Sequence, residues 1–385
     1  MTTTPSTAAL TATIDLGAIA HNVGVLRASS GTDVIAVVKA DAYGHGAVEV
    51  ARAALGAGAA ELGVAHITEA LALRRAGIDA HITSWLHAPS ADFAGAVAAG
   101  IDIAVSSPRQ LDAVVAAARS SGVTATVTVK VDTGLNRSGV AVDEWDSMAV
   151  ALAKARAEES ITMRAAMTHL VRGDEPDHPL NSRQADRLDA AAADLARLGT
   201  APQVVHLANS PAALVRPDLA RDLVRPGIAL YGRSPLPDRG DFGLIPAMTL
   251  TGEISLVKRV TKGQGVSYSH TWTAPHDTVV AVIPAGYADG IPRTMSGRFE
   301  VLVNGRRFPA IGRVCMDQFV IDLGPEGGGV AEGDLAELFG RGDRGGVTAA
   351  DWADATGTID YEILSAVRGR TARRYVGGSS EQPHG

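Results

Sequence analysis

Short apolar segments recur along the first two thirds of the chain, each followed by polar residues and then by a stretch with helical spacing. The eight strands that this pattern predicts are Asp33–Val38, Glu61–His66, His81–Trp85, Asp102–Ser106, Thr124–Asp132, Ile161–His169, Val204–Leu207 and Asp222–Arg225. Between them, Ser107–Ser120 and Ser182–Leu198 carry the spacing of amphipathic helices. Eight strands alternating with helices predict an α/β fold, an N-terminal (β/α)8 TIM-like barrel.

The pattern changes after a connection rich in Pro, Asp and Gly at Pro235–Gly243. From there the sequence predicts short strands separated by turns, at Met248–Val260, Thr278–Ile283, Arg298–Val303 and Phe319–Leu323. The pair Asn304-Gly305 is a strong hairpin signal. We therefore assign residues 11–240 to the barrel and 241–376 to a C-terminal, mainly β domain.

The two ends of the chain need separate treatment. The strand Thr11–Asp15 precedes the barrel pattern and could belong to the second domain instead. Residues 1–10 and 377–385 are predicted to be disordered tails.

Composition narrows the function classes. The chain has 385 residues and a formal net charge of −7, without a long basic block, which argues against nucleic acid and anionic membranes as partners. No apolar run approaches the length of a membrane span, and the N-terminus lacks the features of a signal peptide, so we expect a cytoplasmic enzyme. The single cysteine, Cys315, excludes an intrachain disulfide and a cysteine-based metal cage, and no metal site is predicted.

Candidate chemistry begins where the first barrel strand ends. The strand Asp33–Val38 is followed by Lys39 and a turn of small residues. A charged side chain at the carboxyl end of a parallel strand lies where α/β enzymes keep their chemistry, and a lysine there could form a Schiff base. The alternative is an ordinary surface lysine at a strand end.

The segment from Val37 to Ala47 favours the first interpretation, because it resembles the pyridoxal 5'-phosphate (PLP) lysine motif of alanine racemases nearly residue for residue. The resemblance implies that Lys39 carries the cofactor and that Tyr43 reaches the cofactor phosphate. Barrel enzymes commonly bind phosphate with the loops after strands seven and eight. Those loops offer the Ser210 hydroxyl beside Asn209, and backbone N–H groups at Gly227 and Ile228.

The resemblance extends over nearly the whole chain. It implies that Arg225 donates to the pyridine nitrogen, that His169 lies against the cofactor ring, and that Tyr361 helps to hold the phosphate. Because arginine stays protonated and can only donate, the nitrogen that it faces is kept unprotonated. The resulting weaker electron sink suits racemisation better than transamination.

Racemisation requires acid/base groups on both faces of Cα. Lys39 can serve one face, and Tyr268 occupies the family's tyrosine-base position for the other. Without the resemblance, a packed tyrosine of the β domain would be the simpler interpretation. A phenol with an ordinary pKa near ~10 is a poor base at neutral pH, so its surroundings must favour the phenolate.

Two further motifs resemble the family's substrate-binding segments. In Lys130–Gly139, the resemblance makes Arg137 the contact for the substrate carboxylate and makes Lys130 a lysine that many members carbamylate to brace that arginine. In Gly312–Gln318, it assigns the Met316 backbone N–H to the same carboxylate, although Met316 could be a core residue, and gives Asp317 a supporting role. Tyr287 and Tyr361 resemble the inner gate of the access channel, and the next layer is Asp174, Arg293, Arg313 and Ile359.

One nearby residue is harder to assign. Arg172, in the loop from Leu170 to Asp174, is expected to be exposed and solvated, and attraction of the substrate carboxylate is the alternative role.

Taken together, the resemblance implies an enzyme that interconverts L-alanine and D-alanine and supplies D-alanine for peptidoglycan synthesis. It also implies a homodimer with shared active sites, in which one barrel supplies the lysine and the β domain of the second copy supplies the tyrosine.

Three rival functions are weaker. A PLP-dependent decarboxylase of the same fold type resembles a different pattern, with a carboxylate at the pyridine nitrogen and a catalytic cysteine, and Arg225 and Tyr268 oppose it. A single-barrel PLP carrier would lack the β domain. A nucleotide-dependent oxidoreductase is disfavoured because Gly56–Glu61 lacks the third glycine of the fingerprint and precedes a strand.

Overall fold

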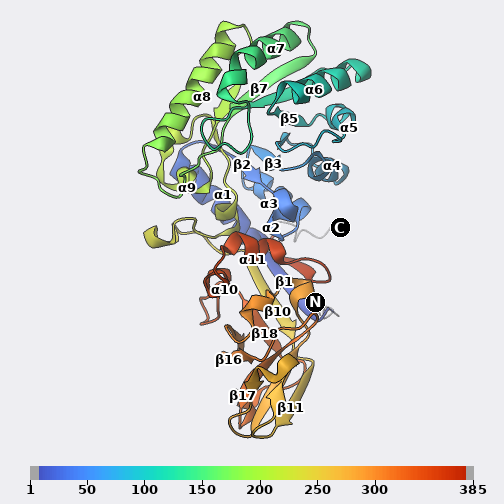
Figure 1. Ribbon diagram of the computed structural model, residues 1–385, viewed down its shortest axis with the longest axis vertical. Helices are drawn as coiled ribbons and strands as arrows, with labels where there is room; N and C mark the ends of the chain where they lie inside the picture. The colour runs from blue at the N-terminus through green and yellow to red at the C-terminus, as the bar shows by residue number, and fades with distance from the viewer. Residues whose placement is uncertain (1–7, 379–385) are drawn as a thin grey trace, which may run out of the picture. The chain divides into compact units, whose positions relative to one another are not determined.

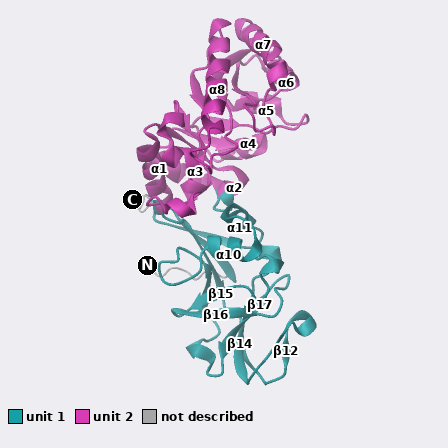
Figure 2. Ribbon diagram, turned by 60° about the vertical axis from the view of Figure 1, so that its left-hand side comes forward, with its two compact units in different colours: residues 1–17, 43–46, 245–385 teal, residues 18–42, 47–244 magenta. Residues whose placement is uncertain are grey.

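The chain divides into two compact units, which Figure 2 colours separately. The computed structural model describes residues 8–378. The barrel unit comprises residues 18–42 and 47–244, and the β unit comprises the described parts of 1–17, 43–46 and 245–385. The predicted disorder of the outermost residues, 1–7 and 379–385, lies outside the described residues, whereas Leu10 already begins a strand.

The barrel unit contains eight parallel strands in the order β8-β7-β6-β5-β4-β3-β2-β9. Their bounds are β2 Asp33–Val37, β3 Glu61–Val64, β4 Ile82–Ser84, β5 Asp102–Val105, β6 Ala125–Lys130, β7 Ile161–Met167, β8 Val204–His206 and β9 Leu223–Val224. The chain segments of β8 and β9 are joined by backbone hydrogen bonds, from Asp222 N to Val205 O at 3.1 Å and from Arg225 N to Ala208 O at 2.8 Å. The predicted barrel is confirmed, and each predicted strand lies within three residues of the observed one.

Helices alternate with these strands and surround them (Figure 1). They are α1 Leu16–Ser30, α3 Ala47–Gly56, α4 Ile67–Arg75, α5 Phe93–Ala98, α6 Pro108–Ser121, α7 Trp145–Ala157, α8 Leu180–Arg197 and α9 Ser210–Val215. The two predicted helices correspond to α6 and α8. Ser107 caps α6 by accepting from Gln110 N at 3.4 Å, and Gly122 ends the helix with a left-handed φ of 67°.

The β unit is built on a nine-stranded sheet in the order β11-β14-β17-β16-β15-β18-β10-β1-β19. The bounds are β1 Leu10–Asp15, β10 Met248–Glu253, β11 Leu256–Val260, β14 Thr278–Ile283, β15 Glu300–Val303, β16 Arg306–Ile311, β17 Phe319–Gly324, β18 Leu335–Phe339 and β19 Ala372–Val376. A separate hairpin pairs β12 Gly265–Val266 with β13 Trp272–Thr273. The hairpin predicted at Asn304-Gly305 is confirmed, because Val303 pairs with Arg306 and both turn residues have positive φ.

The structure corrects two expectations for this region. The single strand predicted at Met248–Val260 is two strands that lie in different parts of the sheet, β10 beside β18 and β11 beside β14. The strand at Thr11–Asp15 was counted with the barrel range 11–240, yet it pairs with β10 and β19, which was the alternative placement. Its alternation of buried and half-buried residues suits a two-faced sheet rather than a buried barrel strand.

Two short helices of the β unit were not predicted, α10 Ala349–Thr356 and α11 Asp360–Ala366. Helix α10 supplies core to the sheet, because Trp352 packs edge to face against Phe299 and Phe339 at centroid distances of 5.4 and 5.1 Å. A capping box from Thr348 to Asp351 begins this helix.

The chain leaves the barrel unit for four residues, 43–46, directly after the turn that follows β2. Glycine is required at positions 44 and 46, because a side chain there would collide with other residues of the β unit. A Cβ on Gly44 would lie 2.4 Å from the Leu364 carbonyl oxygen, and one on Gly46 would lie 2.0 Å from the Tyr375 hydroxyl. These residues therefore pack tightly within the β unit.

Candidate active site

Lys39 follows β2 and begins a left-handed turn. Ala40, Asp41, Ala42 and Tyr43 all have φ of 53°. Non-glycine residues adopt this conformation at a cost of roughly 1–2 kcal/mol each, so other contacts must impose it. Hydrogen bonds hold both sides of the lysine, from Val38 N to Gly63 O at 2.9 Å and from Ala40 N to Glu69 Oε1 at 2.7 Å.

Four cationic side chains, Lys39, Lys130, Arg137 and Arg225, act on one another in the barrel unit. Burial, followed by the charge of Arg137, lowers the pKa of Lys39 from its ordinary value of 10.5, and the charge of Glu69 opposes this. Burial and the charges of Arg225 and Arg137 lower the pKa of Lys130 to about 8. Lys130 and Arg225 of this group are buried, and neighbouring like charges are stabilised by anions, so this end of the barrel is suited to phosphate and carboxylate groups.

The buried Arg225 guanidinium is fixed by its two Nη groups. Nη1 donates to His206 Nδ1 at 2.6 Å and to His206 O at 2.9 Å, and Nη2 donates to Thr168 O at 2.5 Å. The Nε–H has no acceptor among residues 8–378 and is available for a ligand. Burial lowers the pKa of Arg225 to about 10, so it stays protonated at neutral pH.

Two histidines adjoin this arginine, and both stay neutral. Burial and then the charges of Arg225 and Arg137 lower the pKa of His169 to about 3. The sequence analysis missed the second one, His206. Because Arg225 can only donate, His206 Nδ1 must accept, and burial holds the pKa of His206 well below its ordinary value. The only feature of the sequence that could have identified His206 is its position at the end of strand β8.

The loops after β8 and β9 meet through Ser210. Its Oγ accepts from Gly227 N at 2.8 Å and from Ala229 N at 3.3 Å. This corrects the expectation that Gly227 presents a free N–H, because Ser210 already binds it. The Ser210 hydroxyl hydrogen and the Ile228 N–H remain as donors within the described chain, while Asn209 accepts from Ala212 N at 3.4 Å.

The loop that carries Arg137 is pinned at its base. Val140 N donates to Lys130 O at 2.8 Å, and Asp132 N donates to Val140 O at 3.0 Å. Lys130 Nζ donates to Ser138 Oγ at 2.6 Å. Arg137 itself is exposed, and its charge is felt by Lys39, Lys130 and His169.

Two predicted phosphate ligands meet in the β unit. The rings of Tyr43 and Tyr361 lie 6.2 Å apart, centre to centre, at an angle of 48°. Burial raises the pKa of Tyr43, which therefore remains a hydroxyl donor. The structure thus brings together two residues separated by most of the chain.

Tyr268 lies on the exposed tip of the β12–β13 hairpin. The backbone is left-handed on both sides of it, with φ of 64° at Ser267 and 59° at Ser269. The Ser267 hydroxyl donates to Arg313 O at 2.8 Å, which ties the hairpin to the loop containing Met316. Strain that is held by such bonds is typical of functional positions.

The Met316 loop is anchored by its carbonyl groups. Tyr287 N donates to Cys315 O at 3.1 Å, and Ala288 N donates to Met316 O at 3.0 Å. Asp317 forms an ion pair with Arg370 at 2.5 Å, and Arg370 also binds the buried Asp289 at 2.7 Å. Arg370 and Asp289, which the sequence analysis missed, anchor Asp317, whose supporting role stays a prediction.

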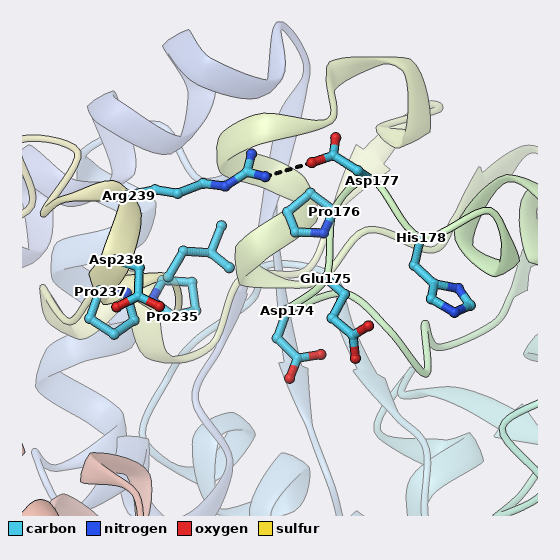
Figure 3. A pocket seen from close by; sticks show the side chains of 10 residues that line it. Asp174, Glu175, Pro176, Asp177, His178, Pro235, Pro237, Asp238 and Arg239 are labelled. Atoms are coloured by element: carbon cyan, nitrogen blue, oxygen red, sulfur yellow. Dashed lines mark hydrogen bonds and ion pairs between the residues drawn. The ribbon is translucent and has the colours of Figure 1, made fainter.

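The proposed entrance residues occur in both units. Asp174 lines a cavity of about 490 Å³ in the barrel unit, with residues 175–178 and 235–239 (Figure 3). Arg239 crosses it to form a 2.6 Å ion pair with Asp177. Arg172 is about half exposed and paired with Glu175, in agreement with the solvated interpretation. Tyr287, Arg293, Arg313 and Ile359 all belong to the β unit.

Comparisons with known proteins cover both units. A family profile described as "Alanine racemase, N-terminal domain" matches residues 14–235, and one described as "Alanine racemase, C-terminal domain" matches residues 247–375. Alanine racemase of Mycolicibacterium vanbaalenii is 56% identical over 385 residues, which cover 98% of this chain and 99% of that protein. Alanine racemase of Mycobacterium tuberculosis is 56% identical over 365 residues, covering 94% and 95%.

Solved structures agree with these relatives. The crystal structure of alanine racemase from D-cycloserine-producing Streptomyces lavendulae has a TM-score of 0.93 at 46% identity, covering 97% of this chain and 98% of that one. Alanine racemase from Bacillus anthracis with bound L-Ala-P has a TM-score of 0.89 at 34% identity, covering 97% of each chain. Every helix among residues 8–378 is too short or too polar to cross a lipid bilayer.

Proposed function

Because the chain belongs to the alanine racemase family of isomerases, we propose that it interconverts L-alanine and D-alanine with PLP bound at the carboxyl end of the barrel. The observation that carries this proposal is the Arg225 guanidinium, whose Nη groups are fixed and whose Nε–H is left for a ligand. A lysine, an anion-binding loop and a flat neutral imidazole lie in the same unit.

The residues present fit PLP. Tyr43, Tyr361, the Ser210 hydroxyl and the Ile228 N–H would hold its phosphate, with Asn209 bordering that loop and Gly227 bound to Ser210. His169 would lie against the ring, and Lys39 would carry the cofactor covalently. When bound, PLP withdraws electrons from the substrate Cα and makes its proton acidic.

Arg225 would select the type of reaction. It is a donor at neutral pH, so the group that it faces must accept and stay unprotonated. By keeping that acceptor unprotonated, Arg225 would weaken the electron withdrawal that the cofactor supplies and so favour prompt return of the proton to Cα. This supports racemisation over transamination. It also opposes the decarboxylase alternative, which requires a carboxylate at this position.

Two proton-transfer groups are required. Lys39 is suited to one face of the substrate, because its lowered pKa leaves more of the amine neutral at a given pH. Tyr268 would act on the opposite face. We propose that Tyr268 comes from a second copy of the chain in a homodimer, since it is exposed on its own β unit.

The substrate carboxylate would meet Arg137 and the Met316 N–H, which has no acceptor among the described residues. Lys130 is suited to carbamylation because a pKa of about 8 leaves a neutral amine available to carbon dioxide. The carbamate would place a negative charge near Arg137 and Arg225, and so relieve the cluster of like charges. Carbon-13 NMR with labelled bicarbonate should show one carbamate signal that is absent from Lys130→Arg.

The access channel would be lined by Tyr287 and Tyr361, followed by Asp174, Arg293, Arg313 and Ile359.

We further propose that the D-alanine formed supplies peptidoglycan synthesis. The β unit opposes the single-barrel carrier alternative, which has no use for such a domain.

A chiral assay tests the function directly. The purified protein should convert either enantiomer of alanine to an equal mixture, lose this activity when PLP is removed, and regain it when PLP is added back. An absorption band near ~420 nm that borohydride abolishes should accompany the active form. A protein that shows this band but leaves both enantiomers unchanged would contradict the proposal.

A further inference from the structure

The carboxylate of Glu69, in the first turn of α4, accepts three backbone N–H groups. Oε2 accepts from Ala65 N and from His66 N, both at 2.9 Å, and Oε1 accepts from Ala40 N at 2.7 Å. The first two bonds close the start of α4, as in an ordinary capping box. The third does nothing for the helix, because Ala40 lies beyond the end of β2.

That third bond acts on the peptide that joins Lys39 to Ala40. The peptide on the other side of the lysine is held by the bond from Val38 N to Gly63 O at 2.9 Å. Lys39 is therefore fastened on both sides to one neighbouring strand and helix, β3 and α4. Ala40 is also the first of the four left-handed residues, so the Glu69 bond is placed where the strained turn begins.

We propose that Glu69 is a positioning residue for Lys39: its carboxylate fixes the peptide from which the lysine side chain extends, and its negative charge acts on the amine. This inference rests on the proposed role of Lys39 as the PLP lysine.

Electrostatics support the second half of the proposal. Burial and the charge of Arg137 lower the pKa of Lys39, and the charge of Glu69 opposes them. Lys39 in turn acts on Lys130 of β6 and on His169 after β7. Glu69 is the carboxylate that counters this group of cations at the lysine, so neutralising it should lower the pKa of Lys39 further.

The competing interpretation is that Glu69 only caps a helix, and the chain contains a matched control for it. Asp351 closes the start of α10 in the same way, accepting from Thr348 N at 2.6 Å and from the Thr348 hydroxyl at 2.9 Å. Asp351→Asn therefore neutralises the acidic residue of a capping box in the β unit without touching the proposed lysine site.

The test compares Glu69→Gln, Glu69→Asp and Asp351→Asn as holoenzymes. Glu69→Gln should lower kcat by about 10- to 100-fold with KM changed by less than about threefold, because one amide oxygen cannot accept all three N–H groups and the lysine loses the charge beside it. The acidic limb of its kcat–pH profile should move to lower pH, because the pKa of Lys39 falls when the charge of Glu69 is removed. Glu69→Asp keeps the charge but is too short to reach Ala40, so kcat should fall while the limb stays. Asp351→Asn should lower the melting temperature and change neither kcat nor the limb.

Hydrogen exchange gives a readout that does not depend on activity. The Ala40 amide of the unmodified protein should exchange at least about tenfold more slowly than in an unfolded chain, and this protection should be lost in Glu69→Asp, whose carboxylate is too short to reach Ala40. An unprotected Ala40 amide overturns the proposal even if no variant folds. So does a Glu69→Gln enzyme that is less stable but has normal kcat and an unmoved pH limb.

Peptide mapping of borohydride-treated wild type separates this inference from the function that it rests on. PLP trapped on a residue other than Lys39 overturns the proposed site. PLP trapped on Lys39, with Glu69→Gln unaffected, overturns only the role of Glu69.

Discussion

The barrel unit and the β unit present their candidate site residues in opposite ways. In the barrel, Arg225, Lys130 and Ser210 are 6%, 5% and 3% exposed, and hydrogen bonds within the unit fix each of them. In the β unit, Tyr268, Ile359 and Met316 are 69%, 59% and 52% exposed. Large apolar side chains are exposed there at the same positions that the sequence marks as functional.

This difference suggests how the work is divided. The barrel unit groups positively charged side chains, of which Lys130 and Arg225 are buried and hydrogen-bonded within the unit. The β unit leaves its candidate side chains exposed on loops, and the residues on both sides of Tyr268 have positive φ. A surface of this kind is suited to completing a site on a second copy, and the predictions below test that division.

The largest expected effect follows from removing the barrel lysine. Lys39→Ala should lower racemisation by at least about 10⁴-fold, because a proton-transfer group and the covalent anchor disappear together. The chiral assay and the borohydride-sensitive band would measure the two losses separately. Lys154→Ala, which removes an exposed lysine of α7, is the control and should leave both unchanged. Near-normal turnover in Lys39→Ala would rule out the assignment.

A mixing experiment tests whether the two units of different chains form one site. Lys39→Ala and Tyr268→Ala chains should each be inactive alone. In a heterodimer, one site would contain both substitutions and the other neither, so random assortment should restore about a quarter of the wild-type sites. Native mass spectrometry would verify that heterodimers form. An inactive mixture with heterodimers present would place each complete site within one chain.

A smaller effect is expected when the barrel arginine is changed. Arg225→Glu should lower racemisation by about 10- to 100-fold and raise pyruvate formation, because the pyridine nitrogen could then be protonated. Arg225→Lys keeps a donor-only side chain and should keep the ratio of D-alanine to pyruvate near the wild-type value. If both variants give the same ratio of D-alanine to pyruvate, Arg225 does not select the reaction type.

The smallest effect concerns acid stability and again separates the units. Burial lowers the pKa of His87 to about 4 and of His169 to about 3, both in the barrel. The unfolded chain takes up these protons as the pH falls through about 6.5, whereas the folded chain does not. Stability should therefore fall with decreasing pH below 6.5, by up to about 1.4 kcal/mol per pH unit for each histidine.

Hydrogen exchange at pH 6.5 and pH 4.5 would show where this loss occurs. Protection should fall more in the barrel helices than in the nine-stranded sheet. His87→Gln can still donate to the Ser84 carbonyl, which His87 Nε2 contacts at 3.0 Å, and it should reduce the pH dependence by about one proton. Equal losses in both units would mean that the buried histidines do not control acid sensitivity.

The barrel could be predicted from the sequence because its strands are short apolar runs whose order in the chain is their order in space. The β unit was harder. Its sheet joins β1 from the N-terminus to β19 from the C-terminus, and the break between β10 and β11 at Ile254 and Ser255 interrupts a continuous β-rich run. Helices α10 and α11 are short, and their role is visible only in the packing of Trp352.

The candidate site divides along the same line. Residues in long motifs, such as Lys39 and Arg137, could be predicted as site residues because the whole motif resembles a segment with a known role in the family. Glu69, His206 and Arg370 each form a hydrogen bond with a residue that is 19 to 53 positions away, and no local pattern predicts these contacts.

By itself, the sequence determined the alternation of strands and helices, the family and the chemical groups at the site, because periodicity and motifs are local properties. Only the tertiary structure decided which groups are charged and which donors are free. Burial lowers the pKa of Lys130, Ser210 takes up the Gly227 N–H, and Glu69 meets the peptide after Lys39. Each of these depends on the distance between atoms from different elements, and folding alone sets that distance.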